Sequence, residues 1–195
     1  MLLFLILADI VKRRIYNCMI KTNKPEVWLR GAVTNIPALL QPVAHTLLQA
    51  REEVNEMLPG FSEDHLWDKP AGVASVGFHL QHLTGVLDRL FTYARGNALN
   101  NEQLKALTVE GKPEEYSGNI QELVQLFNQQ VDKSLEQLST INEQTLQELI
   151  GVGRAQLPST VFGLLIHSAE HTMRHVGQLL VTVRIIKAAL ATEIK

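Results

Sequence analysis

The chain has 195 residues, of which 46% are apolar and 19% are charged, and its formal net charge at pH 7 is −2. These values exclude a disordered chain and predict one globular domain that is long enough to bury a substantial core. The only basic run covers residues 12–14, so we expect no nucleic-acid partner. The single cysteine, Cys18, excludes an intrachain disulfide and fits a reducing compartment such as the cytoplasm.

The N-terminal stretch is strongly apolar over residues 1–8, but Asp9 interrupts it, and a membrane-spanning helix needs about 20 apolar residues. A secretory signal carries its positive charge before the apolar run, whereas here the basic residues follow it. We therefore expect neither a membrane partner nor a cleaved signal. Residues 1–24 are predicted to be an extension, either an appended helix or the result of a start codon placed too early, with Met19 as the alternative start. The helical domain is then expected over residues 25–195.

Apolar residues recur with helical spacing in four long segments of this domain. The first begins at Ile36 and ends at Leu58, although an interior proline at Pro42 would kink a helix and moves the expected start to about Gln41. The second segment covers residues 73–94.

The third long segment covers residues 120–138, and the fourth runs from Ser159 or Thr160 to about Ala189. Shorter helices are predicted in the connections, over residues 62–67, 102–107 and, more weakly, 143–149. No segment shows a convincing strand pattern. The sequence therefore predicts an all-α fold, a four-helix bundle with short extra helices in its connections.

Three of the seven histidines lie four residues apart in the fourth segment, at His167, His171 and His175. Side chains four residues apart share one face of a helix and are separated by about 6 Å along its axis, so two imidazoles can converge on one metal ion. The outer pair is separated by about 12 Å, which is too far for one ion with bonds of about 2.0–2.1 Å to nitrogen. His171 belongs to either possible pair.

These histidines lie in a polar stripe of the fourth helix that carries no fixed charge; its members are Ser168, His171, His175, Gln178 and Thr182. A helix face made only for solvent usually carries charged residues, so the stripe predicts a cavity wall or a seam between helices. Gly177 lies within it, where glycine costs about 1 kcal/mol relative to alanine. Close approach of a neighbouring helix or a ligand would explain this glycine.

A third metal ligand would come from the second helix, which offers His79 and His82. Either one, with two histidines of the fourth helix, gives three neutral nitrogen donors and an open position, as in catalytic zinc sites. The alternative is that all of these are structural histidines of a helix seam. His45 and His65 lie outside both clusters and are expected to be ordinary surface or packing residues. Glu170 points about 100° away from His171 and is expected to be solvated.

Two motifs resemble the DinB/YfiT-like superfamily, a set of four-helix metal-binding proteins. They are SVGFHLQHL at residues 75–83 and EHTMRHVGQ at residues 170–178, and YARG at residues 93–96 also resembles the family. The resemblance implies an up-down-down-up bundle, often a homodimer, with a divalent metal on three histidines. The ligand positions of the motifs fall on His82, His171 and His175, whereas His79 and His167 fall on positions that are not ligands.

The resemblance also implies two kinds of activity. Some members resemble enzymes that join low-molecular-weight thiols to small electrophiles or isomerise the adducts, and others are described only as metal-dependent hydrolases. Our first hypothesis is a metal-dependent enzyme of the thiol S-transferase or hydrolase type that acts on a small molecule. A metal would hold the thiol as thiolate, the nucleophilic form. Three imidazoles suit zinc and nickel, which we expect first, and also iron or copper.

Our second hypothesis is a non-catalytic, metal-binding and dimerising helical module. It is motivated by the lack of any clearly placed acid, base or anion-binding cluster in the sequence. A thiol that bears carboxylates would need arginines near the metal, and the candidates are Arg89, Arg174 and Arg184. A fourth ligand, such as His79 or His167, would favour this second hypothesis because it would close the open position.

Overall fold

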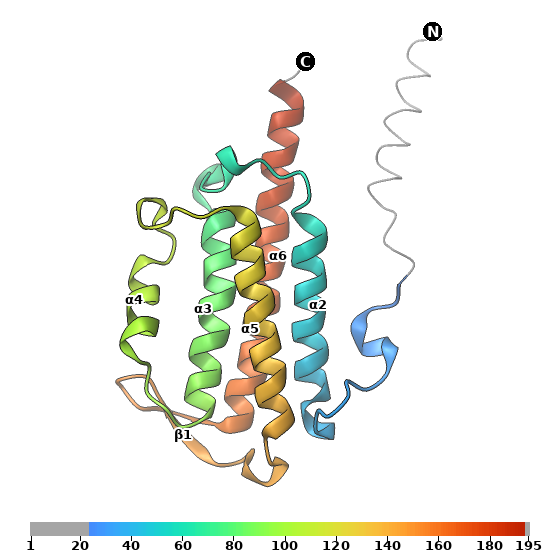
Figure 1. Ribbon diagram of the computed structural model, residues 1–195, viewed down its shortest axis with the longest axis vertical. Coiled ribbons are helices and arrows are strands. Elements are labelled where there is room, and N and C mark those ends of the chain that lie inside the picture. Colours follow the sequence, from blue (N-terminus) through green and yellow to red (C-terminus); the bar gives the residue numbers. More distant parts are fainter. Residues whose placement is uncertain (1–23, 194–195) are drawn as a thin grey trace.

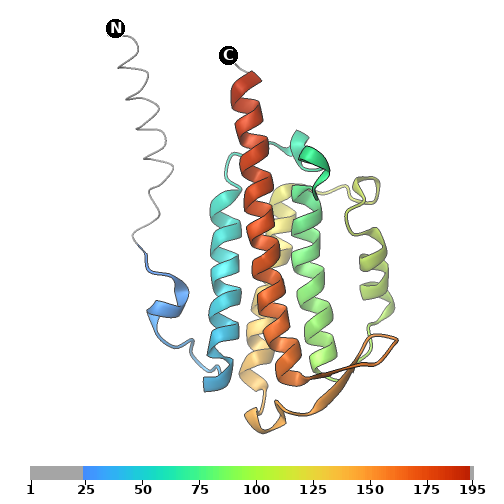
Figure 2. The ribbon, with the colours of Figure 1, turned by 180° about the vertical axis from the view of Figure 1, so that it is seen from behind.

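The computed structural model describes residues 24–193, and the part of the chain that it describes folds as a helical bundle (Figure 1). Four long helices form the bundle: α2 (Gln41–Met57), α3 (Val76–Ala94), α5 (Ile120–Thr140) and α6 (Val161–Glu193). They run up, down, down and up, as expected (Figures 1 and 2). None of the helices in the described residues is long and apolar enough to cross a membrane. The expected N-terminal extension lies outside the described residues, apart from Lys24, and stays a prediction.

Each long helix packs against two others, so that α3 lies between α5 and α6, and α2 contacts the same two helices from the other side. The α3–α6 and α2–α5 pairs are antiparallel, as the views from the two sides show (Figures 1 and 2). The core between them is almost entirely aliphatic and aromatic. Its largest fully buried side chains include Phe91, Phe127, Leu47, Leu80, Leu83, Leu87, Leu165 and Leu179.

The helix starts follow from local capping. Ser75 caps α3 because its hydroxyl accepts a hydrogen bond from the Phe78 N–H at 3.2 Å. Asn119 and Glu122 form a capping box at the start of α5. Pro42 falls in the first turn of α2, where its missing N–H has no helical partner in any case. The expected shift of the first helix start to Gln41 is therefore confirmed.

A long connection leaves α3, carries the short helix α4 (Asn101–Val109) and returns along the outside of α3 before α5 begins (Figure 1). Helix α4 confirms the short helix predicted over residues 102–107, and a capping box of Asn100 and Gln103 fixes its start. The other short elements are single 3₁₀ turns at Val27–Arg30, Ala38–Leu40, Glu63–His65, Pro70–Gly72, Pro113–Glu115 and Glu143–Thr145.

The expectation that the chain has no strand is wrong. Strands β1 (Leu149–Val152) and β2 (Leu157–Thr160) form an antiparallel hairpin just before α6, with Val152 opposite Leu157. The weak helical stretch predicted over 143–149 is a single 3₁₀ turn instead. Burial alternates along β1, but the residue types of neither strand alternate between apolar and polar, so the sequence carries no strand pattern. Pro158 is tolerated because a two-stranded ribbon consists of edge strands only. Helix α6 therefore begins at Val161, after the residues expected to start it, and continues to Glu193.

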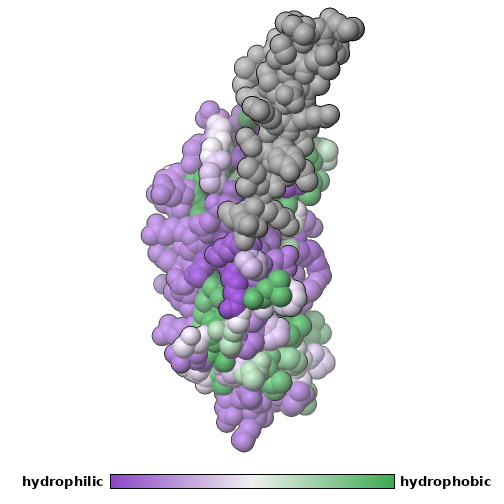
Figure 3. Space-filling view, turned by 90° about the vertical axis from the view of Figure 1, so that its right-hand side faces the viewer, coloured by the Kyte–Doolittle hydropathy of each residue, from purple (hydrophilic) through white to green (hydrophobic). Residues whose placement is uncertain are grey.

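Apolar side chains are also exposed on the face that includes α2 (Figure 3). In the segment before this helix, Leu29 and Leu39 are each 57% exposed, and Trp28 is 61% exposed. These three side chains lie in one segment of the chain, residues 28–39, ahead of α2.

Candidate metal centre

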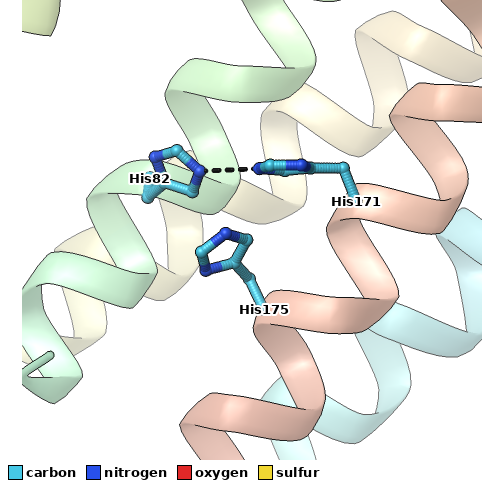
Figure 4. A group of neighbouring side chains, drawn as sticks. All are labelled: His82, His171 and His175. Carbon is cyan, nitrogen blue, oxygen red and sulfur yellow. Dashed lines mark hydrogen bonds between the residues drawn. The ribbon is translucent and has the colours of Figure 1, made fainter. Parts of the chain in front are cut away.

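Three histidines from two helices meet between α3 and α6 (Figure 4). His82 comes from α3, and His171 and His175 come from α6; one ring nitrogen from each lies within 4.8 Å of the other two. Nε2 of His82 is 2.9 Å from Nε2 of His171. The ring of His175 completes the group, with its centroid 4.2 Å from that of His82 and 4.7 Å from that of His171.

Helix geometry decides which histidines join this group. His171 and His175 are four residues apart on the face of α6 that packs against α3, so both rings point at the same turn of the neighbouring helix. His167 lies one turn earlier, where its side chain is 50% exposed and contacts Glu170 at 3.2 Å. The structure thus brings together the inner pair of the fourth helix with His82, and it leaves His167 at the surface.

His82 has a second set of contacts on its other nitrogen. Its Nδ1–H donates to a carboxylate oxygen of Glu110, and the second oxygen of Glu110 accepts from Arg89 Nη1 at 3.0 Å. Burial opposes ionisation of Glu110, but the hydrogen bond from His82 and the charge of Arg89 outweigh it and hold the pKa of this carboxyl below its ordinary value. Phe78 stacks on the His82 ring with a centroid distance of 5.3 Å, which shields this side of the imidazole.

His79 contacts Nδ1 of His175, much as Glu110 contacts Nδ1 of His82. It is only 3% exposed, and its Nδ1 lies 3.2 Å from Nδ1 of His175, so one of the two atoms donates and the other accepts. This contact occupies Nδ1 of His175 and leaves Nε2 for the cluster. His79 is therefore a neighbour of the three-histidine group and not a member of it, as the resemblance implied.

Burial favours the neutral form of three of these rings, those of His79, His171 and His175. Desolvation, reinforced by His82, lowers the pKa of His79 to about 4, and desolvation with the neighbouring histidines lowers the pKa of His175 to about 4. Burial also holds the pKa of His171 below its ordinary value. Neutral imidazole is the form that donates a lone pair to a metal, so at pH 7 protons do not compete for these nitrogens.

The donor set fits a divalent ion. A tetrahedral ion with bonds of about 2.0–2.1 Å to nitrogen separates its ligand atoms by about 3.3 Å. The observed nitrogens lie within 4.8 Å of one another, and Nε2 of His82 and Nε2 of His171 are 2.9 Å apart, so their spacing is similar to that of ligands around one ion. Nδ1 of His171 is buried and has no hydrogen-bond partner among residues 24–193, so no described residue holds this ring on that side. The three-histidine group is therefore able to hold a metal.

The other expectations about α6 concern its polar stripe, Gly177 and Glu170, and not all of them are confirmed. Ser168 and Thr182 are buried, which confirms a seam between helices along most of the stripe, but Gln178 is exposed. Of the two explanations expected for Gly177, close approach of a neighbouring helix is wrong, because a Cβ at this position would meet no atom of the described residues within 4 Å. Close approach of a ligand stays a prediction. Glu170 is exposed and bonded to Arg174, as a solvated residue should be.

Sequence reasoning missed Glu110 and misjudged Arg89. Glu110 lies 28 residues from His82 in a connection with no recognisable motif, so no spacing pattern links the two. Arg89 was a candidate for binding the carboxylates of a substrate, but its guanidinium faces Glu110 in a buried ion pair. Only the path of the α4–α5 connection along α3 reveals both roles.

The fold and the cluster together define a class of protein: an up-down-down-up helical bundle with a group of histidines able to hold a metal between its second and fourth long helices. A sequence profile of the DinB superfamily matches residues 46–179, and the chain belongs to this superfamily. The match includes all of α3 and α5, most of α2, the first part of α6 and all three histidines of the group. No curated protein matches the chain significantly.

Solved structures with the same fold come from several bacteria. A DinB-like protein from Bacillus subtilis, YjoA, is 26% identical, with a TM-score of 0.54, over 75% of this chain and 92% of its own. A conserved protein from Enterococcus faecalis is 20% identical, with a TM-score of 0.61, over 76% of this chain and 97% of its own. A protein from Streptococcus pneumoniae is 12% identical, with a TM-score of 0.53, over 75% of this chain and 88% of its own. At 20% and 12% identity, the last two show a shared fold alone.

The lowered pKa of buried His79 predicts that acid destabilises the metal-free protein. The unfolded chain binds a proton near pH 6.5 and the folded chain only near pH 4, so between these values the unfolded state holds more protons and stability falls as pH falls. One such histidine contributes up to about 1.4 kcal/mol per pH unit. Urea unfolding of metal-free protein at several pH values should show this slope, and His79→Gln should make it less steep, while His175, whose pKa is also about 4, maintains part of it. An unchanged slope in this variant would contradict the assignment.

Proposed function

We propose that the protein binds one divalent metal ion on His82, His171 and His175. The observation that supports this most directly is that one ring nitrogen from each lies within 4.8 Å of the others, although the residues come from two separate helices. Burial, which lowers the pKa of His171 and His175 and so favours their neutral forms, also favours metal binding. Zinc and nickel are the ions we propose first, with iron or copper as alternatives, because all of them accept imidazole donors.

We further propose that the metal-bound protein is an enzyme that acts on a small molecule, as a thiol S-transferase. His79 and His167 lie outside the three-histidine group, which leaves a coordination position for a substrate, as in catalytic sites with three protein ligands. When bound, a divalent ion would lower the pKa of a thiol and hold it as the nucleophilic thiolate. A metal-dependent hydrolase acting on a small molecule is the alternative within this class, since the same open position would also take a water.

The residues of the chain have distinct tasks in this reaction. His82, His171 and His175 would hold the ion, while Phe78 covers one face of the His82 ring and limits access of water. The sulfur of the thiol forms a carbon–sulfur bond with an electron-poor carbon, the leaving group departs with the electrons of its bond, and the thiol proton passes to solvent. Arg89 is engaged with Glu110, so recognition of a negatively charged thiol would fall to other residues.

The second candidate, a non-catalytic metal-binding module, has one observation in its favour. The acidic residues nearest the cluster are committed to other contacts, since Glu110 is bonded to His82 and Arg89, and Glu170 is bonded to Arg174. No carboxylate in these contacts is left to act as a general base. A thiol that is already deprotonated needs no such base, which is why we favour the transferase. We propose that the protein acts in the cytoplasm, in keeping with its single cysteine.

Removal of His171 should abolish tight metal binding. The expected result is one equivalent of Zn²⁺ or Ni²⁺ per wild-type chain by elemental analysis and calorimetry, and a loss of at least about 100-fold in affinity for His171→Ala, because one of three ligand bonds disappears. His167→Ala is the matched control, because this histidine lies one turn away on the same helix, half-exposed. Equal affinity in both variants would contradict the assigned ligands.

Metal-loaded protein should accelerate the reaction of cysteine or glutathione with an activated aryl chloride. The rate should rise because the metal increases the fraction of the thiol that is present as thiolate. The reaction can be followed by the absorbance of the aryl thioether as it forms and chloride leaves. Metal-free protein and His171→Ala should show the uncatalysed rate, whereas His167→Ala should react like the wild type. A rate that is the same for wild type and His171→Ala would end the transferase proposal, although metal binding could still stand.

We propose a second copy of this chain as the protein partner. The exposed Trp28, Leu29 and Leu39 precede α2 and supply an apolar surface that a dimer would bury. Light scattering is expected to give twice the mass of the chain, and Leu29→Glu with Leu39→Glu should shift the mass to that of a monomer. A wild-type monomer at high micromolar concentration would exclude the dimer.

A further inference from the structure

One residue of the connection between α4 and α5, Glu110, contacts the histidine cluster. Glu110 follows α4 directly, and its side chain is only 8% exposed. The next residue, Gly111, has a φ of +79° and donates its N–H to the side-chain oxygen of Gln81 at 2.7 Å. A Cβ at Gly111 would lie 2.7 Å from the Phe78 ring, so glycine allows the loop to lie directly on α3.

A glycine in α3, Gly85, leaves room for the ion pair between Arg89 and Glu110. A Cβ at Gly85 would lie 2.5 Å from Nη1 of Arg89 and 3.0 Å from the Glu110 carboxylate. The ion pair therefore occupies the volume above the bare backbone of Gly85. Glycine in the interior of a helix costs about 1 kcal/mol relative to alanine, and this contact gives a reason for it.

Both oxygens of this buried carboxylate are used, and their partners differ in kind. One accepts from Arg89, whose side chain is 11% exposed, and the other accepts from His82 Nδ1–H. A neutral imidazole carries a single N–H, so a proton on Nδ1 leaves the lone pair on Nε2. Nε2 is the atom of His82 that lies 2.9 Å from His171 Nε2, inside the cluster.

We propose that Glu110, held in place by Arg89, is a positioning residue that fixes the ring orientation and tautomer of His82 so that Nε2 faces the metal. This inference rests on the proposed metal binding. A carboxylate behind a ligating histidine also makes the imidazole a stronger donor. Within the part of the chain that the structure describes, His171 has no such partner on its buried Nδ1, so the donor atom of His82 is set more firmly than that of His171.

The test compares Glu110→Ala and Glu110→Gln with the wild type, using Zn²⁺ as the probe. Loss of the carboxylate should weaken Zn²⁺ binding by about 10- to 100-fold in a competition assay with a chelating dye. Glu110→Gln should lose less, because its amide oxygen can still accept from Nδ1–H. Long-range ¹H–¹⁵N NMR spectra of the histidine rings should show the proton of His82 on Nδ1 in the wild type, and a mixture of tautomers in metal-free Glu110→Ala.

Gln81→Ala is the matched control, because it loosens the same loop at Gly111 without touching His82. It should keep Zn²⁺ affinity and the Nδ1–H tautomer. Equal losses of affinity in Gln81→Ala and Glu110→Ala would overturn the positioning role, as would an unchanged tautomer and affinity in Glu110→Ala. A wild-type protein that binds no Zn²⁺ would instead overturn the proposed function, together with this inference.

Discussion

The structure depends on the antiparallel packing of α3 against α6. Leucines on both helices, among them Leu80, Leu83 and Leu179, are completely buried and make this contact stable. The same packing forces the polar face of α6 against α3, where imidazoles replace apolar side chains. Burial of polar groups costs free energy unless they are hydrogen-bonded, and most of these rings find a partner in another ring or in Glu110. A seam of this composition is poorer in stability than an apolar one, which is typical of a functional site.

The topology of the bundle explains how a third element takes part. In an up-down-down-up arrangement, α3 and α5 are parallel, so a long connection must return along the outside of the bundle between them. This connection carries α4 and delivers Glu110 to the back of His82. The helices therefore supply the nitrogen donors, whereas the connection supplies the negative charge. The connection that the topology requires between α3 and α5 therefore also contributes a residue beside the candidate metal centre.

The charges around the cluster restrict what it can recognise. Arg89 is buried and paired with Glu110, and Arg174 lies at the surface in contact with Glu170. Within the group, burial disfavours protonation of His171 and His175. An ion bound there would therefore be the dominant local positive charge, which suits an anionic ligand such as a thiolate better than a cationic one.

The sequence by itself determined the four long helices, because hydrophobic periodicity and caps such as Ser75 are local properties. It also determined that His171 and His175 share a face, since spacing along a helix needs no tertiary information. Spacing alone left His79 and His82 as alternatives, although the motif resemblance favoured His82. The rotation of α3 against α6, which core packing sets, brings His82 to this pair and places His79 behind it. The hairpin before α6 and the approach of Glu110 were hidden for a related reason. Both depend on contacts between segments that carry no periodic pattern. These contacts form because the fold brings the segments close together, and the residue types alone do not predict them.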